Sequence, residues 1–407
     1  MSEWKKVKLD ELYEVHNGLS KGRQFFGTGF PFLTFSNVFN NWFLPKQLES
    51  LVQTTDKERE ACSIKAGDVF ITRTSETMDE LGMSSVALKD YPNATYNGFT
   101  KRLRPITDRV NPRYIGYYLR TPKFRGQFMA FSSMTTRASL ANNDLLNMEV
   151  ELPPMEIQLR IASILSRYDS LIENYQKQIK LLEEAAQRLY KEWFVDLRFP
   201  GHENTIIVDG VPEGWEKKPA LDFFEMSIGK TPPRAQKQWF TKGSNGIPWV
   251  SISDMKETMF VQETAEELTQ DACENYNIKV VPKGTILLSF KLTVGRVAFA
   301  GTDVCTNEAI AHFQKEGDEW KAYTLMYLRN YNYDSLGNTS GISKAVNSTI
   351  IKNMPFVMPC TAILQEFSQR VLPFIKQTEN LQSQIRLLTE ARDRLLPKLM
   401  SGEIKVS

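Results

Sequence analysis

One stretch of the sequence occurs twice. LIENYQKQIKLLEEA spans 171–185, and QTENLQSQIRLLTEA spans 377–391, 206 residues later. The two stretches share nine identical positions, Glu, Asn, Gln, Gln, Ile, Leu, Leu, Glu and Ala, in the same order and spacing. Agreement on this scale indicates an internal duplication, so the fold must contain two copies of one structural unit.

The repeat extends through most of the chain. EWKKVKLDELYEV at 3–15 matches GWEKKPALDFFEM at 214–226, and IKAGDVFITRT at 64–74 matches VPKGTILLSFK at 281–291. YYLR at 117–120 answers MYLR at 326–329, and LLNMEVELPP at 145–154 answers IIKNMPFVMP at 350–359. Turn residues followed by β-branched or apolar runs predict strands in each half. Similarity is high in the helical stretches and low in the loops, which indicates a shared framework that carries two different β-rich parts.

Each half closes with a long predicted helix. The segment from Glu156 to Phe194 contains no Gly or Pro, with Pro153-Pro154 before it and Phe199-Pro200-Gly201 after it. Its apolar residues follow alternating steps of four and three, which is a heptad pattern. The members are Ile161, Leu165, Tyr168, Ile172, Tyr175, Ile179, Leu182, Ala186, Leu189 and Trp193.

The second helix keeps the same phase but is less regular. Its seam is Phe367, Val371, Phe374, Thr378, Leu381, Ile385, Leu388, Arg392, Leu395 and Leu399. Thr378 and Arg392 interrupt the apolar seam, and Pro373 predicts a kink or a fresh start. A single heptad stripe is often only the buried face of a core helix. Two in-phase stripes favour antiparallel pairing, which would place the β-rich parts at opposite ends of a rod about 58 Å long.

Composition limits the remaining function classes. Apolar content of 42% and a net charge of +2 fit a globular protein whose nucleic-acid contacts, if any, are local. We expect no transmembrane span and no signal peptide. The four cysteines and three histidines are scattered, which predicts no disulfide framework, no metal site and a cytoplasmic location.

The sequence predicts no active site. FFGTG at 25–29 fits the F-x-G-x-G pattern of S-adenosylmethionine-binding loops, but no predicted strand precedes it and no helix follows. NPRY at 111–114 is better explained as a helix start, with Asn111 as the cap and Pro112 in the first turn. No GxxxxGK[ST] phosphate-binding loop is present, so we expect no ATP hydrolysis and no cofactor.

Polar loops at matched places in both halves are candidates for contacting DNA. Lys and Arg neutralise phosphates, Arg pairs with guanine, Asn and Gln pair with adenine, and hydroxyl groups contact either. The structural alternative for any one loop is a solvated surface. The candidates are Lys21, Arg23, Gln24, Arg73, Thr74, Lys101, Arg102, Arg104 and Arg137 in the first half, and Lys230, Arg234, Lys237, Ser251, Ser253, Lys291, Arg296, Ser343 and Lys344 in the second.

Taken together, these motifs resemble the specificity subunits of type I restriction–modification systems. The similarity covers essentially the whole chain. It is most specific in LPPMEIQLRIASILSRYDSLIENYQKQIKLLEEAAQRLYKEWFVDLRFPG, in DGVPEGWE and in LLTEARDRLLPKLMSGEI. The resemblance implies an α+β fold with a pseudo-twofold internal repeat, in which two β-rich target-recognition domains are separated by two long antiparallel coiled-coil helices.

The resemblance also implies the domain plan and the partners. The two target-recognition domains would span 1–150 and 200–357, with spacer helices at 151–199 and 358–407. The chain itself would be non-catalytic and would read an asymmetric bipartite site in double-stranded DNA. Two modification subunits, which bind S-adenosylmethionine and methylate adenine, would dock on it, and ATP-dependent restriction subunits would join them.

The helices also repeat polar residues that face away from the seam. Gln176, Gln178, Lys180 and Glu184 recur in type or charge as Gln382, Gln384, Arg386 and Glu390. A solvated face needs no such match, so these residues are candidates for docking two copies of one partner. Two other readings stay open at this point: a scaffold whose globular parts bind proteins, and a stand-alone methyltransferase with degenerate motifs.

Overall fold

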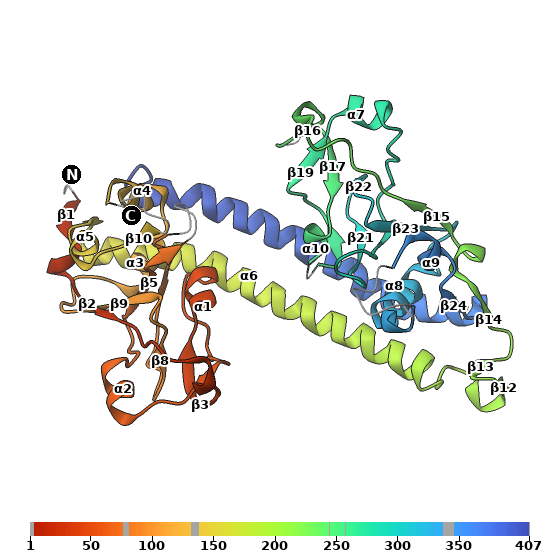
Figure 1. Cartoon of the computed structure of the whole chain (residues 1–407), viewed down its shortest axis with the longest axis horizontal. Coiled ribbons are helices and arrows are strands. Elements are labelled where there is room, and N and C mark those ends of the chain that lie inside the picture. Colours follow the sequence, from red (N-terminus) through yellow and green to blue (C-terminus); the bar gives the residue numbers. More distant parts are fainter. Residues whose placement is uncertain are drawn as a thin grey trace. The chain divides into compact units, whose positions relative to one another are not determined.

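The computed structural model describes residues 4–75, 81–131, 138–243, 245–256, 258–336 and 346–406. The chain divides into two compact units. Unit 1 comprises Met1–Ile172 and Leu388–Ser407, and unit 2 comprises Glu173–Leu387. Two long helices, α6 (Met155–Tyr190) and α10 (Thr361–Met400), contribute residues to both units. Figure 1 shows the elements of each unit.

Unit 1 contains a β-rich part with short helices around it. Its strands are β1 (Lys5–Lys8), β2 (Tyr13–Asn17), β3 (Phe26–Leu33), β4 (Leu51–Val52), β5 (Val69–Thr72), β6 (Thr74–Ser75), β7 (Ser84–Val86), β8 (Thr95–Tyr96), β9 (Thr100–Pro105), β10 (Ala138–Ser139) and β11 (Glu149–Leu152). Its helices are α1 (Phe35–Asn40), α2 (Asp56–Ala61), α3 (Pro112–Tyr118), α4 (Pro122–Phe131) and α5 (Asn142–Leu146).

Unit 2 repeats this plan. Its strands are β12 (Ile207–Val208), β13 (Val211–Pro212), β14 (Glu216–Pro219), β15 (Glu225–Ile228), β16 (Phe240–Thr241), β17 (Ile247–Val250), β18 (Phe260–Val261), β19 (Glu266–Leu268), β20 (Ile286–Ser289), β21 (Val297–Ala300), β22 (Cys305–Thr306), β23 (Ile310–Gln314) and β24 (Pro355–Met358). Its helices are α7 (Gln270–Asn275), α8 (Lys321–Asn330) and α9 (Ser348–Lys352).

The sheets of the two units correspond strand by strand. The order β2-β9-β5-β7 in unit 1 becomes β15-β23-β20-β21 in unit 2, where β18 adds a further strand. The pair β1-β11 corresponds to β14-β24, and the parallel pair β3-β8 corresponds to β17-β22. The central strands β5 (VFIT) and β20 (ILLS) are buried at every position, as expected for the middle of a covered sheet. The predicted β-rich repeat is therefore confirmed.

The turn before each central strand is the same in both units. Gly67 and Gly284 adopt φ angles of +89° and +82°, a conformation that residues with a Cβ rarely adopt. Both glycines come from the matched segments 64–74 and 281–291. The sequence match at these turns thus reflects a shared backbone geometry.

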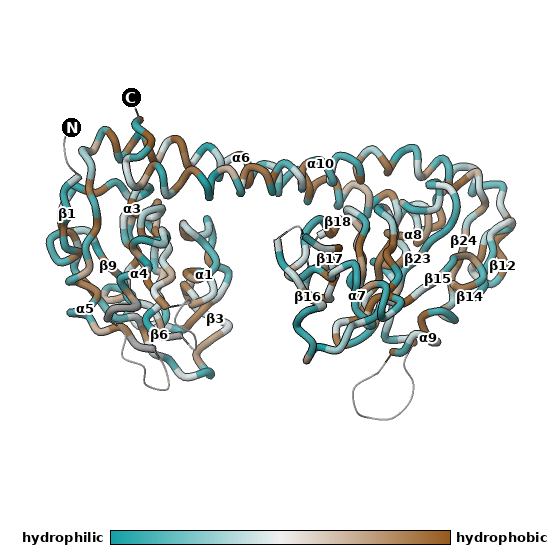
Figure 2. The backbone as a smooth tube through the Cα atoms, turned by 90° about the horizontal axis from the view of Figure 1, so that it is seen from above, coloured by the Kyte–Doolittle hydropathy of each residue, from teal (hydrophilic) through white to brown (hydrophobic). Residues whose placement is uncertain are grey.

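The two long helices pair in antiparallel fashion, as predicted. In unit 1, the Asp169 carboxylate of α6 forms an ion pair with Arg392 of α10 at 2.7 Å. In unit 2, the Trp193 ring, just after α6, lies 5.7 Å from the Phe367 ring of α10. Trp193 follows Asp169 in the sequence, but its partner Phe367 precedes Arg392. The two helices therefore run in opposite directions. Brown and teal alternate along both helices in Figure 2, consistent with one apolar side on each.

The helix ends agree with the sequence signals. Helix α6 starts directly after Pro153-Pro154, and a π-helical turn (Lys191–Val195) follows it before Gly201, which has a φ of +85°. Helix α10 continues through Pro373 without a break, so the fresh start considered for that position is wrong. The Asn111 side chain caps α3 by accepting from the backbone N–H groups of Arg113 and Tyr114, which confirms the helix predicted there.

Candidate nucleic-acid interface

Three of the predicted polar loops of unit 1 meet at one end of its main sheet. Strands β2 and β5 both run antiparallel to β9, so the carboxyl ends of β2 and β5 lie beside the start of β9. The backbone N–H of Leu19 donates to the Tyr96 carbonyl at 2.8 Å, and that of Arg73 donates to the Phe99 carbonyl at 3.0 Å. These bonds join the loops that follow β2, β5 and β8 into one surface.

The same hydrogen bonds recur in unit 2. The N–H of Lys230 donates to the Thr306 carbonyl at 3.0 Å, and the N–H of Phe290 donates to the Ala309 carbonyl at 2.9 Å. An Asx turn precedes strand β9 in unit 1 and strand β23 in unit 2. The amide oxygens of Asn97 and Asn307 accept from the N–H groups two residues later, at 2.8 and 3.1 Å. We call these two matched surfaces the sheet ends.

The sheet end of unit 1 is basic. The loop 138–142 joins it through the β6–β10 pair and through the Leu140 N–H, which donates to the Arg73 carbonyl at 3.1 Å. Lys101 is 4% exposed and its ammonium group donates to the Asn142 side chain, so it supports this surface from within its own unit. Burial, together with the nearby positive charge of Arg73, lowers the pKa of Lys101. The Arg73 Nε is buried and has no hydrogen-bond partner among the described residues.

The sheet end of unit 2 carries charges of both signs. The Glu308 carboxylate accepts from the Thr231 hydroxyl. Burial alone would raise the pKa of Glu308, but hydrogen bonds and the charges of Lys291 and Arg234 hold it below the ordinary value. Arg234 lies over the Phe240 and Trp249 rings, 4.5 Å from each centroid, and forms an ion pair with Glu266 at 2.7 Å. Arg234 and Lys237 also line one surface pocket.

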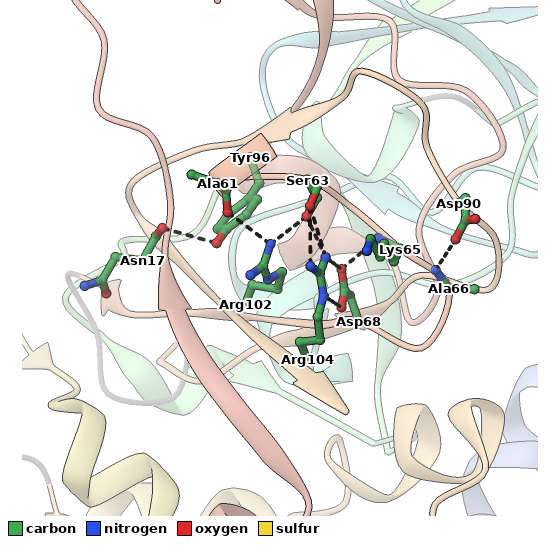
Figure 3. Close-up of polar contacts among 10 residues, drawn as sticks. All are labelled: Asn17, Ala61, Ser63, Lys65, Ala66, Asp68, Asp90, Tyr96, Arg102 and Arg104. Carbon is green, nitrogen blue, oxygen red and sulfur yellow. Dashed lines mark hydrogen bonds and ion pairs between the residues drawn. The ribbon is translucent and has the colours of Figure 1, made fainter. Parts of the chain in front are cut away.

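Two predicted contacts of unit 1 point into the protein instead. Arg102 is 3% exposed and donates to the Ser63 carbonyl at 2.7 Å, and Arg104 forms an ion pair with the buried Asp68 at 2.7 Å. Figure 3 shows both guanidinium groups directed at the Ser63 loop. Their donors are used to hold strand β9 to that loop, so we do not include Arg102 and Arg104 in the candidate interface.

Other predicted residues are partly used within their own unit. The Arg296 guanidinium donates to the Ile252 carbonyl at 2.7 Å, and the Ser251 hydroxyl bonds to Asp254 at 2.6 Å. The Ser253 hydroxyl lies 2.6 Å from that of Ser251. The Lys21 ammonium forms an ion pair with Glu58 at 2.7 Å. These side chains shape the loops around the sheet ends.

The remaining predictions divide into two groups. Arg23, Gln24, Thr74, Lys230, Lys237 and Lys291 are described by the structure and are exposed or half-buried. Arg137, Ser343 and Lys344 lie outside the described residues. Sequence reasoning missed Phe99 and Leu292, apolar side chains at the two sheet ends that are 58% and 101% exposed. It also missed Gln238, although the motif that contains it repeats in the sequence.

The helices carry a second candidate surface, which we call the repeated stripe. It consists of residues on α6 that recur with identical type on α10 at alternating steps of four and three, which places them on one face of each helix. Its members are Asn174, Gln178, Leu181, Ala185 and Arg188 on α6, and Asn380, Gln384, Leu387, Ala391 and Arg394 on α10. Leu181 and Leu387 are 64% and 54% exposed. Exposed leucines at matched positions are typical of a docking surface.

Part of the docking face predicted from sequence is occupied within unit 2. The Gln382 side chain donates to the Thr258 hydroxyl at 2.7 Å and accepts from the Phe260 N–H at 3.2 Å. Arg386 forms an ion pair with Glu263 at 3.5 Å. These two residues hold α10 to the β-rich part, and the repeated stripe lies on the adjoining face.

The described residues provide neither a metal site nor a membrane-spanning helix. They contain no group of three or more His, Cys, Asp or Glu side chains able to hold a metal ion. No helix in the same part of the chain is long and apolar enough to cross a membrane. The FGTG residues of the F-x-G-x-G motif form the start of strand β3. In an S-adenosylmethionine-binding loop, this motif would instead connect a strand to a helix.

The fold and the two sheet ends define a class: an α+β protein built from two copies of a β-rich unit, each joined to a long helix. The family model described as "Type I restriction modification DNA specificity domain" matches residues 1–184 and 212–389. The chain therefore belongs to this family, as a specificity subunit of a type I restriction–modification system.

Relatives and solved structures agree with this assignment. The chain is 27% identical to the type I restriction enzyme MjaIX specificity subunit of Methanocaldococcus jannaschii, over 99% of this chain and 94% of that protein. It is 23% identical to the HindI specificity subunit of Haemophilus influenzae, over 99% of this chain and 100% of that protein. The crystal structure of a type I S subunit from M. genitalium shares the fold, with a TM-score of 0.57 at 12% identity, over 97% of this chain and 96% of that one.

Proposed function

We propose that the chain recognises an asymmetric bipartite site in double-stranded DNA and directs partner subunits to it. The partners would be two S-adenosylmethionine-dependent adenine methyltransferase subunits and ATP-dependent restriction subunits. The chain itself would be non-catalytic and would act in the cytoplasm. Residues 1–150 and 200–357 would be the two target-recognition domains, and 151–199 and 358–407 would be the helical spacers.

The observation that carries this proposal is the pair of equivalent sheet ends with unlike side chains. The positions of Leu19 and the exposed Phe99 in unit 1 correspond to the exposed Lys230 and to Ala309 in unit 2. A shared backbone presents both surfaces in the same way, while the charge on them differs. Two such surfaces would read two different half-sites, because direct readout depends on the donors and acceptors that each surface offers.

The repeated stripe supports a partner that is present in two copies. Replacing Leu181 by Glu should weaken the binding of one methyltransferase subunit by about thirtyfold or more, since a charge would replace an apolar anchor. The L181E variant should therefore bind one copy, and L181E/L387E should bind none. Native mass spectrometry of the reconstituted complex gives these stoichiometries directly.

A matched control for the stripe is L171Q. Leu171 is also exposed, at 41%, and the repeat has Gln377 at the corresponding position. We expect L171Q to retain two copies of the partner. Retention of both copies by L181E/L387E would show that the stripe is not the docking surface.

The DNA-reading role is tested by sequencing methylated bases. Cells that lack other DNA methylation would express the chain together with its methyltransferase partner. We expect methylated adenines in one asymmetric motif of two half-sites with a fixed unread gap. Methylation by the chain without a partner would favour a stand-alone enzyme, and absence of any motif with the partner present would favour a protein scaffold.

A further inference from the structure

A short motif outside the sheet ends repeats in both units. RQFF at 23–26 corresponds to KQWF at 237–240. In each case the first three residues form a 3-10 turn, Arg23–Phe25 in unit 1 and Lys237–Trp239 in unit 2. The fourth residue then begins a strand, β3 or β16. The loops around the motif differ in length and composition between the halves. The presence of the same motif in both halves therefore requires an explanation.

The two turns are anchored in the same way. Phe26 pairs with the buried Val52, and Phe240 pairs with the buried Leu268. The backbone carbonyl of the residue before each strand also accepts a hydrogen bond. Phe25 accepts from the Gln53 N–H at 2.8 Å, and Trp239 accepts from the Thr269 N–H at 3.1 Å. The backbone therefore presents the basic residue and the glutamine of each turn in the same position within its own unit.

Arg23, Gln24, Lys237 and Gln238 are all exposed. None of the four side chains forms a hydrogen bond or an ion pair with another residue in the part of the chain that the structure describes. The aromatic residues of the motif have internal contacts that explain their own repetition, but such contacts do not explain the repeated basic residue and glutamine. The recurrence of these two residues therefore indicates an external partner that both units meet in the same way.

The chemistry of the pair matches duplex DNA. A basic residue supplies a phosphate contact that fixes position, and a glutamine amide can both donate and accept on one edge. That pattern is complementary to the N6 and N7 atoms of adenine in the major groove. Such a contact rests on the proposed function, in which each unit faces DNA.

We propose that Gln24 and Gln238 are matched specificity residues, each reading one A·T pair in its own half-site, while Arg23 and Lys237 position the turns on the backbone. The half-sites would then share one adenine at equivalent places. Their remaining bases would differ, since the sheet ends differ.

The test uses the reconstituted complex with its methyltransferase partner and a library of sites with every base varied. Q24A should relax the preference at one base pair of one half-site by about tenfold to a hundredfold. Q238A should relax one base pair of the other half-site by a similar factor. R23A and K237A should weaken methylation of all sequences alike and reduce its salt dependence, with no position relaxed.

The control is Q47A, which removes another exposed glutamine of unit 1. It should leave the motif unchanged. If the wild-type complex shows a defined motif and both Q24A and Q238A keep it intact, this inference is wrong and the proposed function stands. Uniform weakening by Q24A and Q238A without relaxation would also overturn it, because that is the behaviour of a phosphate contact. A wild-type complex without any motif would refute the proposed function itself.

Discussion

Removing the guanidinium of Arg392 should lower the stability of unit 1 by about 2 kcal/mol. Arg392 pairs with Asp169 at 2.7 Å and with Asp393 at 2.8 Å, and its side chain is 13% exposed. It also lies 5.0 Å from the Trp42 ring centroid, and the Tyr117 hydroxyl donates to Asp169. The R392A variant leaves the partly buried Asp169 without its cation, which costs more than the pair contributes. Thermal unfolding of the full chain measures the loss.

Unit 2 supplies the matched control for this prediction. The positions that correspond to Tyr117, Asp169 and Arg392 in the repeat are Met326, Ile375 and Ala186, and all three are buried. The triple variant Y117M/D169I/R392A copies this apolar arrangement and should recover at least half of the stability lost in R392A. If R392A melts at the wild-type temperature, the polar contact does not hold the helices together in unit 1.

Acidification should destabilise unit 2 through His312. This side chain is fully buried between two hydroxyl groups, with Ser227 Oγ 2.8 Å from Nδ1 and Thr306 Oγ1 2.7 Å from Nε2. Burial, with a smaller contribution from the charge of Lys279, lowers the pKa of His312 from its ordinary value of 6.5 to about 4. As the pH falls, the unfolded chain therefore takes up the proton before the folded chain does.

The stabilisation from neutral His312 is complete above the unfolded pKa and is lost as the pH falls from 6.5 to about 4. We expect a loss of about 2 kcal/mol between about pH 7 and pH 5. Urea unfolding of wild type and H312Q at each pH measures it, because glutamine can bond to both hydroxyls but does not titrate. The difference between the two proteins should shrink on acidification. A difference that is independent of pH would contradict this explanation.

The framework could be predicted from sequence because its signals are local and repeated. The heptad seam is visible in a segment without Gly or Pro, and its members on α6 are buried or half-buried. The matched segments 64–74 and 281–291 predicted the central strands, which the structure places at β5 and β20. The exact domain limits of 150, 200 and 358 stay a prediction, since the compact units cut through both helices.

The role of Arg392 could not be predicted. In the sequence it interrupts an apolar seam and suggests a weaker helix. Its partner Asp169 is 223 residues away, and the pairing exists only because α6 and α10 pack together. A charged residue in an apolar seam destabilises the helix pair unless an opposite charge on the other helix faces it. The sequence of one helix does not show which residue of the other helix lies opposite.

The candidate interface was harder to predict than the fold. Strand β9 reads TKRLRP, and a basic strand suggests an exposed surface. Lys101 and Arg102 are nevertheless buried, because the Asn142 side chain and the Ser63 carbonyl, both distant in the sequence, accept their hydrogen bonds. Gln238 was missed for the opposite reason: its side chain makes no polar contact with the described residues, and its short repeated motif becomes clear only when the turns of the two units are compared.

The central claim is that two independent β-rich readers each specify half of one DNA site. It is tested most directly by replacing residues 1–150 with the corresponding segment of a relative that has another target, and then sequencing the methylated bases. The account predicts that one half of the motif changes while the other half and the gap between them stay the same. A change in both halves, or in neither, would contradict it.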